Sequence, residues 1–415
     1  MRGQTARIEG KALTYYKSSE RNNGSSSSQI INKLIIHCSR LNPDSTALSE
    51  IKNLIEADIN WDKLIKKAAT EKVSPLLYHN LKKFQDKIPE WAIQNLRSMY
   101  IRNKSRNIYL YKKLKPLLKE INDFRLKAAL TKGANLAKTL YKDIGLRYFT
   151  DIDFFVHPSD WRRLKKISEK LGFRGEGYGS SFPNFKMRKS GWPLATHLRK
   201  ERLMLDSHFN YPGIETPLSS HNDIWESAQM VNIEGAEAKI FSPEYELCIL
   251  CLHAQAHSYN RIIWLTDIAE LSSKKEINWN KILFICHREE MHAPVYYGLY
   301  LVNCLWPHTI SKDILDKFRL GKIEKKLLGS LWPEEKVLSR DFSFNTHALA
   351  TSLFLIFSSR RLLLKLKILL SRVFPPLDWA AWRHKVPEDS IKVYIHYLRR
   401  CAKPMIFFYK VLFKA

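Results

Sequence analysis

The chain has 415 residues, of which 45% are hydrophobic and 26% charged, and Lys and Arg outnumber Asp and Glu by 68 to 41. This composition excludes an intrinsically disordered chain, and the lack of a sufficiently long apolar run excludes a membrane-spanning protein. The formal net charge of +27 favours anionic partners, which include nucleoside triphosphates, RNA and anionic membranes.

The N-terminal third of the sequence begins with a polar segment and continues with a helical pattern. Residues 1–29 are polar and end in the run Gly24-Ser25-Ser26-Ser27-Ser28, which predicts a disordered tail. From residue 30 to 123, apolar residues recur every three or four positions, as in Leu64, Ile65 and Ala68. This period predicts a helical domain over 30–123.

Short apolar runs separated by turn residues begin at residue 124 and continue to 241. The run LKAALT predicts a strand that turns at Lys132-Gly133 into a helix, and YFTDIDFFV predicts a second strand. A helix over 161–172 and strands at THLRK and LMLDSHF follow, and five glycines between 172 and 191 indicate a mobile loop. The segment 124–241 therefore reads as a separate unit containing strands.

From residue 242 the helical period returns, with Pro243 suited to a first helical turn. We expect a helical domain over 242–340 and a basic amphipathic helical region over 341–415. The last 58 residues hold thirteen Lys or Arg against three acids. Such a region could bind an anionic membrane surface or RNA, or pack on the core with its charges in water, and the pattern favours neither.

Three acidic residues carry the clearest chemical signal. Side chains alternate along a strand, so Asp151 and Asp153 share one face, and two adjacent carboxylates repel unless a divalent cation lies between them. A single D-x-D also occurs by chance at exposed strand ends. Asp206 adds a third acid on an apolar strand, and three carboxylates can hold a pair of metal ions.

Two further groups fit phosphate chemistry. Gly133 lies at the strand-to-helix turn, where backbone N–H groups and the helix N-terminus can bind a phosphate, and Lys132 adds a positive charge beside it. His208 shares a strand face with Asp206, so it could contact the nucleotide or the acceptor, or serve as a structural histidine.

Together these residues resemble a family, the uncharacterised bacterial nucleotidyltransferases of the DNA polymerase beta superfamily. The resemblance spans about residues 50–305 and continues past the catalytic strands into the following helices. The residues that carry it are Lys132-Gly133-Ala134, Tyr141, Arg147, Asp151-Ile152-Asp153, Asp206-Ser207-His208, Arg261, Trp264, Leu265, Asp267 and Trp279.

The resemblance implies an α+β fold in which a small mixed β-sheet core is inserted between helical N-terminal and C-terminal regions. It also implies two Mg²⁺ ions and transfer of a nucleoside monophosphate from an NTP to a hydroxyl of an unidentified acceptor, with release of pyrophosphate. By this likeness Gly133 lines the triphosphate, Asp151 and Asp153 bind both metals, and Asp206 completes the site and helps to deprotonate the acceptor.

The chain departs from the family pattern at several positions. Ala134 replaces the Ser or Gly that usually follows the glycine, and Lys132 could compensate for the lost phosphate contact. Ser207 and Phe209 replace a leucine and a tryptophan that are frequent in relatives, which affects the acceptor contacts more than the metal site. Arg147 could bind a phosphate or brace the turn before Asp151, and we favour the phosphate.

The spacing C-x2-C-x-H-x3-H at residues 248–257 also suggests a zinc site. On one helix, however, Cys248 and Cys251 lie on a different face from His253 and His257, so one ion cannot collect all four ligands. We interpret the cysteines as core residues, and we expect His253 and His257, with Arg261, to face the nucleotide cleft.

Two rival functions remain. One is a glycosyltransferase with a D-x-D metal site, which would lack the early strand-Gly-helix turn. The other is a non-catalytic basic protein on a degenerate nucleotidyltransferase fold that binds RNA or a membrane surface.

No dense cysteine spacing and no secretory signal are present, so we expect a cytoplasmic protein, either free or peripheral at the inner membrane surface. The sequence suggests no obligate protein partner.

Overall fold

The computed structural model describes residues 26–175, 195–209 and 218–321, together with residues 387, 390–392 and 394–395. Three predictions fall mostly outside these residues: the N-terminal tail before Ser26, the glycine-rich loop beyond Gly175, and the basic region 341–415.

The N-terminal part of the described chain is helical. Its elements are α2 (Ser26–Cys38), α3 (Ser45–Ile55), α4 (Trp61–Thr70), α5 (Ser74–Leu81), the 3₁₀ turn η1 (Lys82–Lys87) and α6 (Glu90–Asp123). Helix α2 begins at Ser26, so the prediction of a disordered tail as far as residue 29 is wrong at its end. The helix begins with a turn of serines, which are favourable at a helix start, and its buried apolar residues Ile31 and Leu34 come after that turn.

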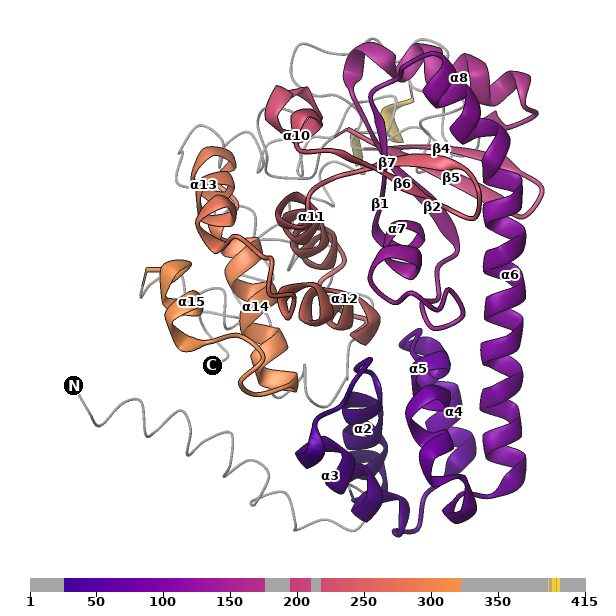
Figure 1. The fold of residues 1–415 in the computed structure, drawn as a ribbon, viewed down its shortest axis with the longest axis vertical. Coiled ribbons are helices and arrows are strands. Elements are labelled where there is room, and N and C mark those ends of the chain that lie inside the picture. The colour runs from indigo at the N-terminus through magenta and orange to yellow at the C-terminus, as the bar shows by residue number, and fades with distance from the viewer. Residues whose placement is uncertain are drawn as a thin grey trace.

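Helix α6 runs along one side of the molecule from the N-terminal helices to the sheet (Figure 1). Two buried asparagines on it fix the chain segment that leads into the second strand. Asn103 donates to the carbonyl of Gly145 at 2.8 Å, and Asn107 donates to the carbonyls of Ile144 and Arg147 at 2.6 and 3.0 Å. Because these amides satisfy buried carbonyls, the entry into that strand is held rigidly against α6.

The central sheet is small and mixed, which confirms the predicted α+β class. The elements are β1 (Ala128–Thr131), α7 (Lys132–Thr139), β2 (Asp151–Val156), η2 (Pro158–Asp160), α8 (Trp161–Lys170), β3 (Arg174–Gly175), β4 (Ala195–Lys200) and β5 (Leu203–His208). The strand order is β1-β2-β5-β4-β3. Among the described strands of this sheet, β2 and β5 form the parallel pair, and the other neighbours are antiparallel.

The sheet register sets the position of the acidic residues. Asp153 on β2 lies opposite Asp206 on β5. Their neighbours Ile152, Phe154 and Leu205 are buried and alternate with them, as expected for strands with one apolar face. The parallel pairing therefore brings the two carboxylates together from distant parts of the chain.

A short segment joins the sheet to the C-terminal helices. It contains η3 (Leu218–Ser220), α10 (Asn222–Glu226) and the hairpin β6 (Gln229–Asn232) and β7 (Glu237–Ile240). The helices that follow are α11 (Pro243–Ala256), α12 (Ile262–Ser272), α13 (Trp279–Glu289), α14 (His292–Leu305) and α15 (Lys312–Lys317).

Two apolar cores stabilise this arrangement. One combines buried residues of α2, α4 and α5 with those of α11, α12 and α14, so the helical regions on either side of the sheet pack together. The other lies between the sheet and helices α6, α7 and α8. The sheet is thus inserted in sequence between helices that share one core.

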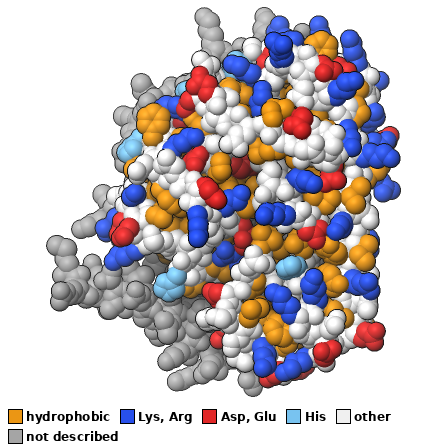
Figure 2. Space-filling model, viewed as in Figure 1, with side chains coloured by type: hydrophobic (Ala, Val, Ile, Leu, Met, Phe, Trp, Pro, Cys, Tyr) orange, Lys and Arg blue, Asp and Glu red, His pale blue; other side chains and the backbone are white. Residues whose placement is uncertain are grey.

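The surface of the described residues is mixed in charge. On the face drawn in Figure 2, Lys and Arg side chains are interspersed with acidic and hydrophobic ones and form no single continuous patch. Within the described ranges, no helix combines the length and the hydrophobicity that crossing a bilayer requires.

Candidate metal centre

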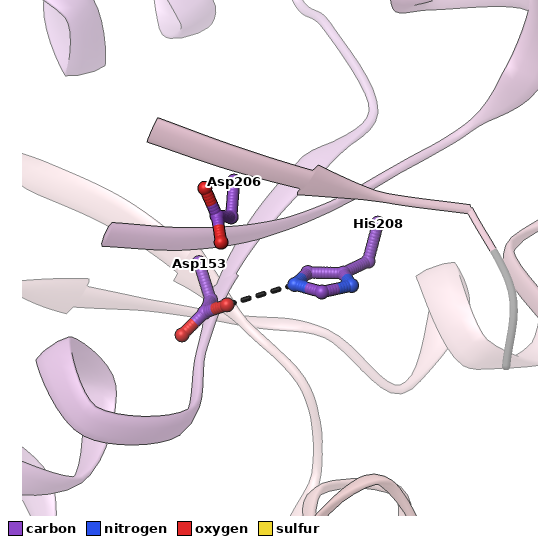
Figure 3. A group of neighbouring side chains, drawn as sticks. All are labelled: Asp153, Asp206 and His208. Carbon is purple, nitrogen blue, oxygen red and sulfur yellow. Dashed lines mark hydrogen bonds and ion pairs between the residues drawn. The ribbon is translucent and has the colours of Figure 1, made fainter. Parts of the chain in front are cut away.

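Three side chains from β2 and β5 converge on one point (Figure 3). They are Asp153, Asp206 and His208, and each offers one potential ligand atom within 4.8 Å of the other two. Asp153 and Asp206 are opposed across the parallel pair, and His208 is two residues beyond Asp206 on the same face. This group could hold a metal ion.

Asp151 belongs to the same electrostatic cluster. It opens β2 and is two residues before Asp153, so the two share a strand face. Burial, together with the negative charges of Asp153 and Asp206, raises the pKa of the Asp151 carboxyl to about 6. The three predicted acids therefore interact, although only Asp153 and Asp206 have ligand atoms in the group with His208.

Lys132 provides the positive charge for this cluster. Its Nζ lies 2.5 Å from Asp153 Oδ1, and both side chains are buried. Burial opposes ionisation of Asp153, but Lys132 and His208 outweigh it and hold the pKa of Asp153 down at about 2. Lys132 also has a positive φ of 55°, which costs a lysine about 1 kcal/mol, so the turn directs this ammonium group inward at the expense of backbone strain.

His208 contacts both members of this ion pair. Its Nε2 lies 2.8 Å from Asp153 Oδ1 and 3.0 Å from Lys132 Nζ. Burial and the charge of Lys132 lower the pKa of His208, so its imidazole is neutral at physiological pH. A neutral imidazole can orient the carboxylate or bind a metal ion.

His197 is a site residue that the sequence analysis missed. It lies opposite Asp206 across the antiparallel β4–β5 pair, and its Nδ1 donates to Asp206 Oδ1 at 2.7 Å. This hydrogen bond raises the pKa of His197. The signal was present, because the two-residue turn at Glu201 and Arg202 fixes the hairpin register that pairs residue 197 with residue 206.

Glu246, on α11, is a second residue that was missed. Its carboxylate accepts the backbone N–H of Lys132 at 2.7 Å and the hydroxyl of Thr131 at 2.8 Å. The turn at which we expected backbone N–H groups to face a phosphate therefore already has one of them bound to a carboxylate. No local pattern predicts this contact, because the residues are more than a hundred positions apart.

We predict that Glu246 makes the stability of the fold pH-dependent. Burial raises the pKa of its carboxyl from 4.5 to about 7, although hydrogen bonds from Lys132 and Thr131 act in the opposite direction. Because the pKa of the Glu246 carboxyl is higher in the folded than in the unfolded state, proton binding by Glu246 stabilises the fold. This contribution is fully present below about pH 4.5 and is lost as the pH rises through about 7.

Glu246→Gln keeps the shape without the titration, so the two proteins should differ in their pH dependence. From about pH 5 to about pH 8, the wild-type free energy of unfolding should fall by about 2 kcal/mol more than that of the variant. Urea denaturation across this range measures the difference, with the exposed Glu237→Gln as control. Parallel pH profiles for wild type and Glu246→Gln would contradict the prediction.

Gly133 is required by packing at this turn. A Cβ built on it would lie 2.6 Å from Phe149 Cβ and 3.7 Å from an Arg147 guanidinium nitrogen. Phe149 Cβ is fixed by the backbone and cannot move aside. The glycine therefore lets α7 approach the segment that leads into β2, and its predicted contact with a triphosphate stays a prediction.

We predict that Gly133→Ala destabilises the protein by about 1–3 kcal/mol, because the added methyl group overpacks the contact with Phe149. Glycine to alanine inside a helix ordinarily stabilises by about 0.5–1 kcal/mol, so the sign of the change is diagnostic. Chemical denaturation measures it. An increase in the free energy of unfolding would rule out the packing role.

Arg147 is engaged in a buried ion pair. Its Nε lies 2.8 Å from Asp267 Oδ1, and Tyr141 donates to the same oxygen at 2.8 Å. The guanidinium also donates to the carbonyl of Tyr148. These contacts brace the turn before Asp151 against α12. Bracing was the role of Arg147 that we did not favour from the sequence, and its binding to a phosphate stays a prediction.

The structure brings His253 next to the cluster. Its Nδ1 lies 3.5 Å from Lys132 Nζ, and its ring contacts those of His257 and Trp264. Arg261 lies over the Trp264 ring at 5.3 Å and is exposed. These aromatic groups thus connect the buried lysine to the surface.

Cys248 and Cys251 are buried in the helical core. Among the described residues, the one cluster with metal-ligand geometry contains neither of them.

Comparison with known proteins gives one family match. A family model described as "Uncharacterised nucleotidyltransferase" matches residues 57–307, which is more than half of the chain. Among solved structures, the chain is similar to an antigenic nucleotidyltransferase-like protein from Paracoccidioides brasiliensis. The two are 17% identical with a TM-score of 0.32, over 50% of this chain and 92% of the other. No curated protein matches the chain.

Proposed function

The chain belongs to the uncharacterised nucleotidyltransferase family, and on that premise we propose that it transfers a nucleoside monophosphate from an NTP to a hydroxyl group. The observation that carries this proposal is the convergence of Asp153 and Asp206 beside Lys132, with Asp151 coupled to both carboxylates.

The proposed reaction exchanges one phosphorus–oxygen bond for another. The acceptor oxygen forms a bond to the α-phosphorus of the NTP, and the bond from that phosphorus to the bridging oxygen of the β-phosphate breaks. Pyrophosphate leaves with the bonding electron pair, and the acceptor proton passes to a base of the protein. The protein must therefore hold the triphosphate, align the hydroxyl and accept one proton.

The donor set fits a divalent cation. Carboxylate oxygens are the ligands that Mg²⁺ prefers, and Asp153, Asp206 and Asp151 supply them on adjoining strands. When bound, the cations would lower the pKa of the acceptor hydroxyl and neutralise negative charge on the departing pyrophosphate. We propose two Mg²⁺ ions, held chiefly by Asp151 and Asp153 and completed by Asp206.

Lys132 has a role at each stage of this proposal. Before substrate binds, its ammonium group neutralises Asp153, which keeps the buried carboxylate cluster stable. A cation bound at Asp153 would replace that ion pair and release the ammonium to donate hydrogen bonds to a phosphate oxygen. His208 then holds the orientation of Asp153 through its own hydrogen bond.

Asp206 is the proposed proton acceptor. His197 binds one of its oxygens, Oδ1, which leaves Oδ2 to face the acceptor hydroxyl. The proton taken up by Asp206 is released to solvent when the product leaves, and the hydrogen bond from His197 holds the carboxylate in place for both steps.

Incubation of the intact protein with each α-labelled NTP, Mg²⁺ and cell extract tests the proposal. We expect label to enter an acceptor fraction with at least one NTP, and the transfer to cease when Mg²⁺ is chelated. Absence of transfer with all four NTPs, together with absence of Mg²⁺-dependent NTP binding by calorimetry, would favour the non-catalytic alternative.

A further inference from the structure

A basic cavity lies between the N-terminal helices and the segment that leads into β2. Its volume is about 380 Å³, and its lining comes from the end of α4, the start of α5, the middle of α6 and the residue three before Asp151. The described residues that line it include no acidic side chain. The polar and charged residues among them are Lys72, Ser74, Arg102, Asn103, Arg106 and Tyr148.

Two of the cations contact the same aromatic ring. Lys72 Nζ lies 4.5 Å from the centroid of the Tyr148 ring, and the guanidinium carbon of Arg106 lies 4.2 Å from the same centroid. The ring faces attract each cation, but no carboxylate in the cavity lining offsets their mutual repulsion. Arg102 adds a third positive charge to the same lining. An anion in the cavity would relieve the repulsion.

Two polar atoms in the lining have no hydrogen-bond partner among the described residues. They are Ser74 Oγ, in a side chain that is almost fully buried, and Arg106 Nε. Nη2 of Arg106 donates to Asn103 Oδ1 and Asn107 Oδ1, both at 3.3 Å, so the guanidinium is held in place while Nε stays unsatisfied. Buried polar groups without partners destabilise a fold, so these atoms indicate a ligand with hydrogen-bonding oxygens.

The backbone at Lys72 supports the same conclusion. Lys72 follows α4 with a φ of 63°, and the N–H of Val73 binds the carbonyl of Ala68, which is the helix ending that normally uses glycine. A lysine in this conformation strains the backbone where glycine would not. Here the side chain supplies a cation at the cavity.

We propose that this cavity binds a phosphate group of a ligand, separately from the carboxylate cluster. A phosphate presents several acceptor oxygens and up to two negative charges, which suits Lys72, Arg102 and Arg106. Ser74 contributes its hydroxyl, and the N-terminus of α5, which Ser74 opens, adds the positive end of a helix dipole.

A chain of contacts joins the cavity to the proposed catalytic cluster. Glu71, next to Lys72, accepts the N–H of Ile262 at 2.7 Å, and the neighbouring Arg261 lies over Trp264. Trp264 contacts His253, whose Nδ1 lies 3.5 Å from Lys132 Nζ. In the proposed transfer reaction, the two sources of such a phosphate are the nucleotide and a phosphorylated acceptor. That assignment rests on the proposed transfer reaction, whereas phosphate binding does not.

Calorimetric titration of the full chain in EDTA, with inorganic phosphate, pyrophosphate, ribose 5-phosphate and ATP, tests the binding site. Lys72→Gly removes the cation and relieves the backbone strain, so the variant should fold at least as well as wild type. We expect it to bind the phosphate-bearing probes about ten-fold or more weakly, and Arg106→Gln to do the same.

Lys142→Gly is the matched control. Lys142 has the same φ of 63°, but it is exposed and is not part of the cavity lining. Its replacement should leave probe affinity unchanged. Equal affinity in Lys72→Gly and wild type, or no binding of any probe to wild type, would overturn the proposal.

The probes also identify the source of the phosphate. If ATP competes with pyrophosphate in EDTA and loses affinity in Lys72→Gly, the cavity holds a nucleotide phosphate. If ribose 5-phosphate depends on Lys72 while ATP binding depends on Mg²⁺ and Asp206 instead, the cavity holds the phosphate of an acceptor. Both results retain the binding site. Failure of nucleotidyl transfer would leave these titrations unaffected, so the two proposals fail separately.

Discussion

Replacing Asp206 with asparagine should lower the rate of nucleotidyl transfer by about 10³-fold or more without unfolding the protein. The amide has the size of the carboxylate, but it neither neutralises a divalent cation nor accepts the acceptor proton. The Lys132–Asp153 ion pair is untouched, and the contact that Asp206 makes with His197 lies at a partly exposed side chain. The effect should therefore appear in kcat rather than in stability.

The labelled-NTP assay measures this loss, and urea denaturation checks that the variant is folded. Asp223→Asn provides the control, because Asp223 is also ion-paired but binds Arg288 and Tyr245, away from the cluster. It should keep wild-type activity. Undiminished transfer by Asp206→Asn would remove Asp206 from the proposed mechanism.

Replacing Lys132 with methionine should reduce the free energy of unfolding by about 3 kcal/mol in EDTA, and Mg²⁺ should restore part of that loss. The substitution leaves Asp153 buried without its cation and next to Asp151 and Asp206. A divalent cation can replace the lost charge, so it should stabilise the variant more than it stabilises wild type. Denaturation curves with and without Mg²⁺ measure both effects.

Lys138→Met is a matched control on the same helix. Lys138 pairs with Glu234 at 2.7 Å, but both side chains are about one-third exposed. The loss should be below about 1 kcal/mol and independent of Mg²⁺. If Mg²⁺ stabilised the Lys132 and Lys138 variants equally, the cation would not be replacing Lys132 at Asp153.

Local patterns predicted most of the sheet and its acidic residues. The order of strand, turn, helix and strand from residue 128 to 156 follows from turn residues and apolar runs. The alternation of side chains along a strand placed Asp206 and His208 on the same face, as they are in the structure. The likeness to a known family supplied the mixed sheet, which local patterns alone do not define.

The contacts that complete the site come from distant parts of the chain and have no local signal. Glu246 beneath the turn and Asp267 against Arg147 are each more than a hundred residues from their partners. Burial decides them, because a carboxylate in the core must be matched by the nearest donor or cation. His197 is different, since the two-residue hairpin turn alone was sufficient to place it opposite Asp206.

The start of α2 and the basic cavity also could not be predicted from the sequence. Helix α2 begins before the apolar period does, because serines can form the first turn of a helix whose buried face lies further along. Lys72, Arg106 and Tyr148 are separated in sequence and become one surface only when α6 packs against the segment before β2.

Crystals soaked with Mn²⁺ and a non-hydrolysable NTP test the central claim most directly, since anomalous scattering locates the cation. We predict a peak within about 2.0–2.4 Å of carboxylate oxygens of both Asp153 and Asp206, with the Lys132–Asp153 ion pair broken. Mn²⁺ bound only elsewhere, with Lys132 still paired to Asp153, would contradict the account.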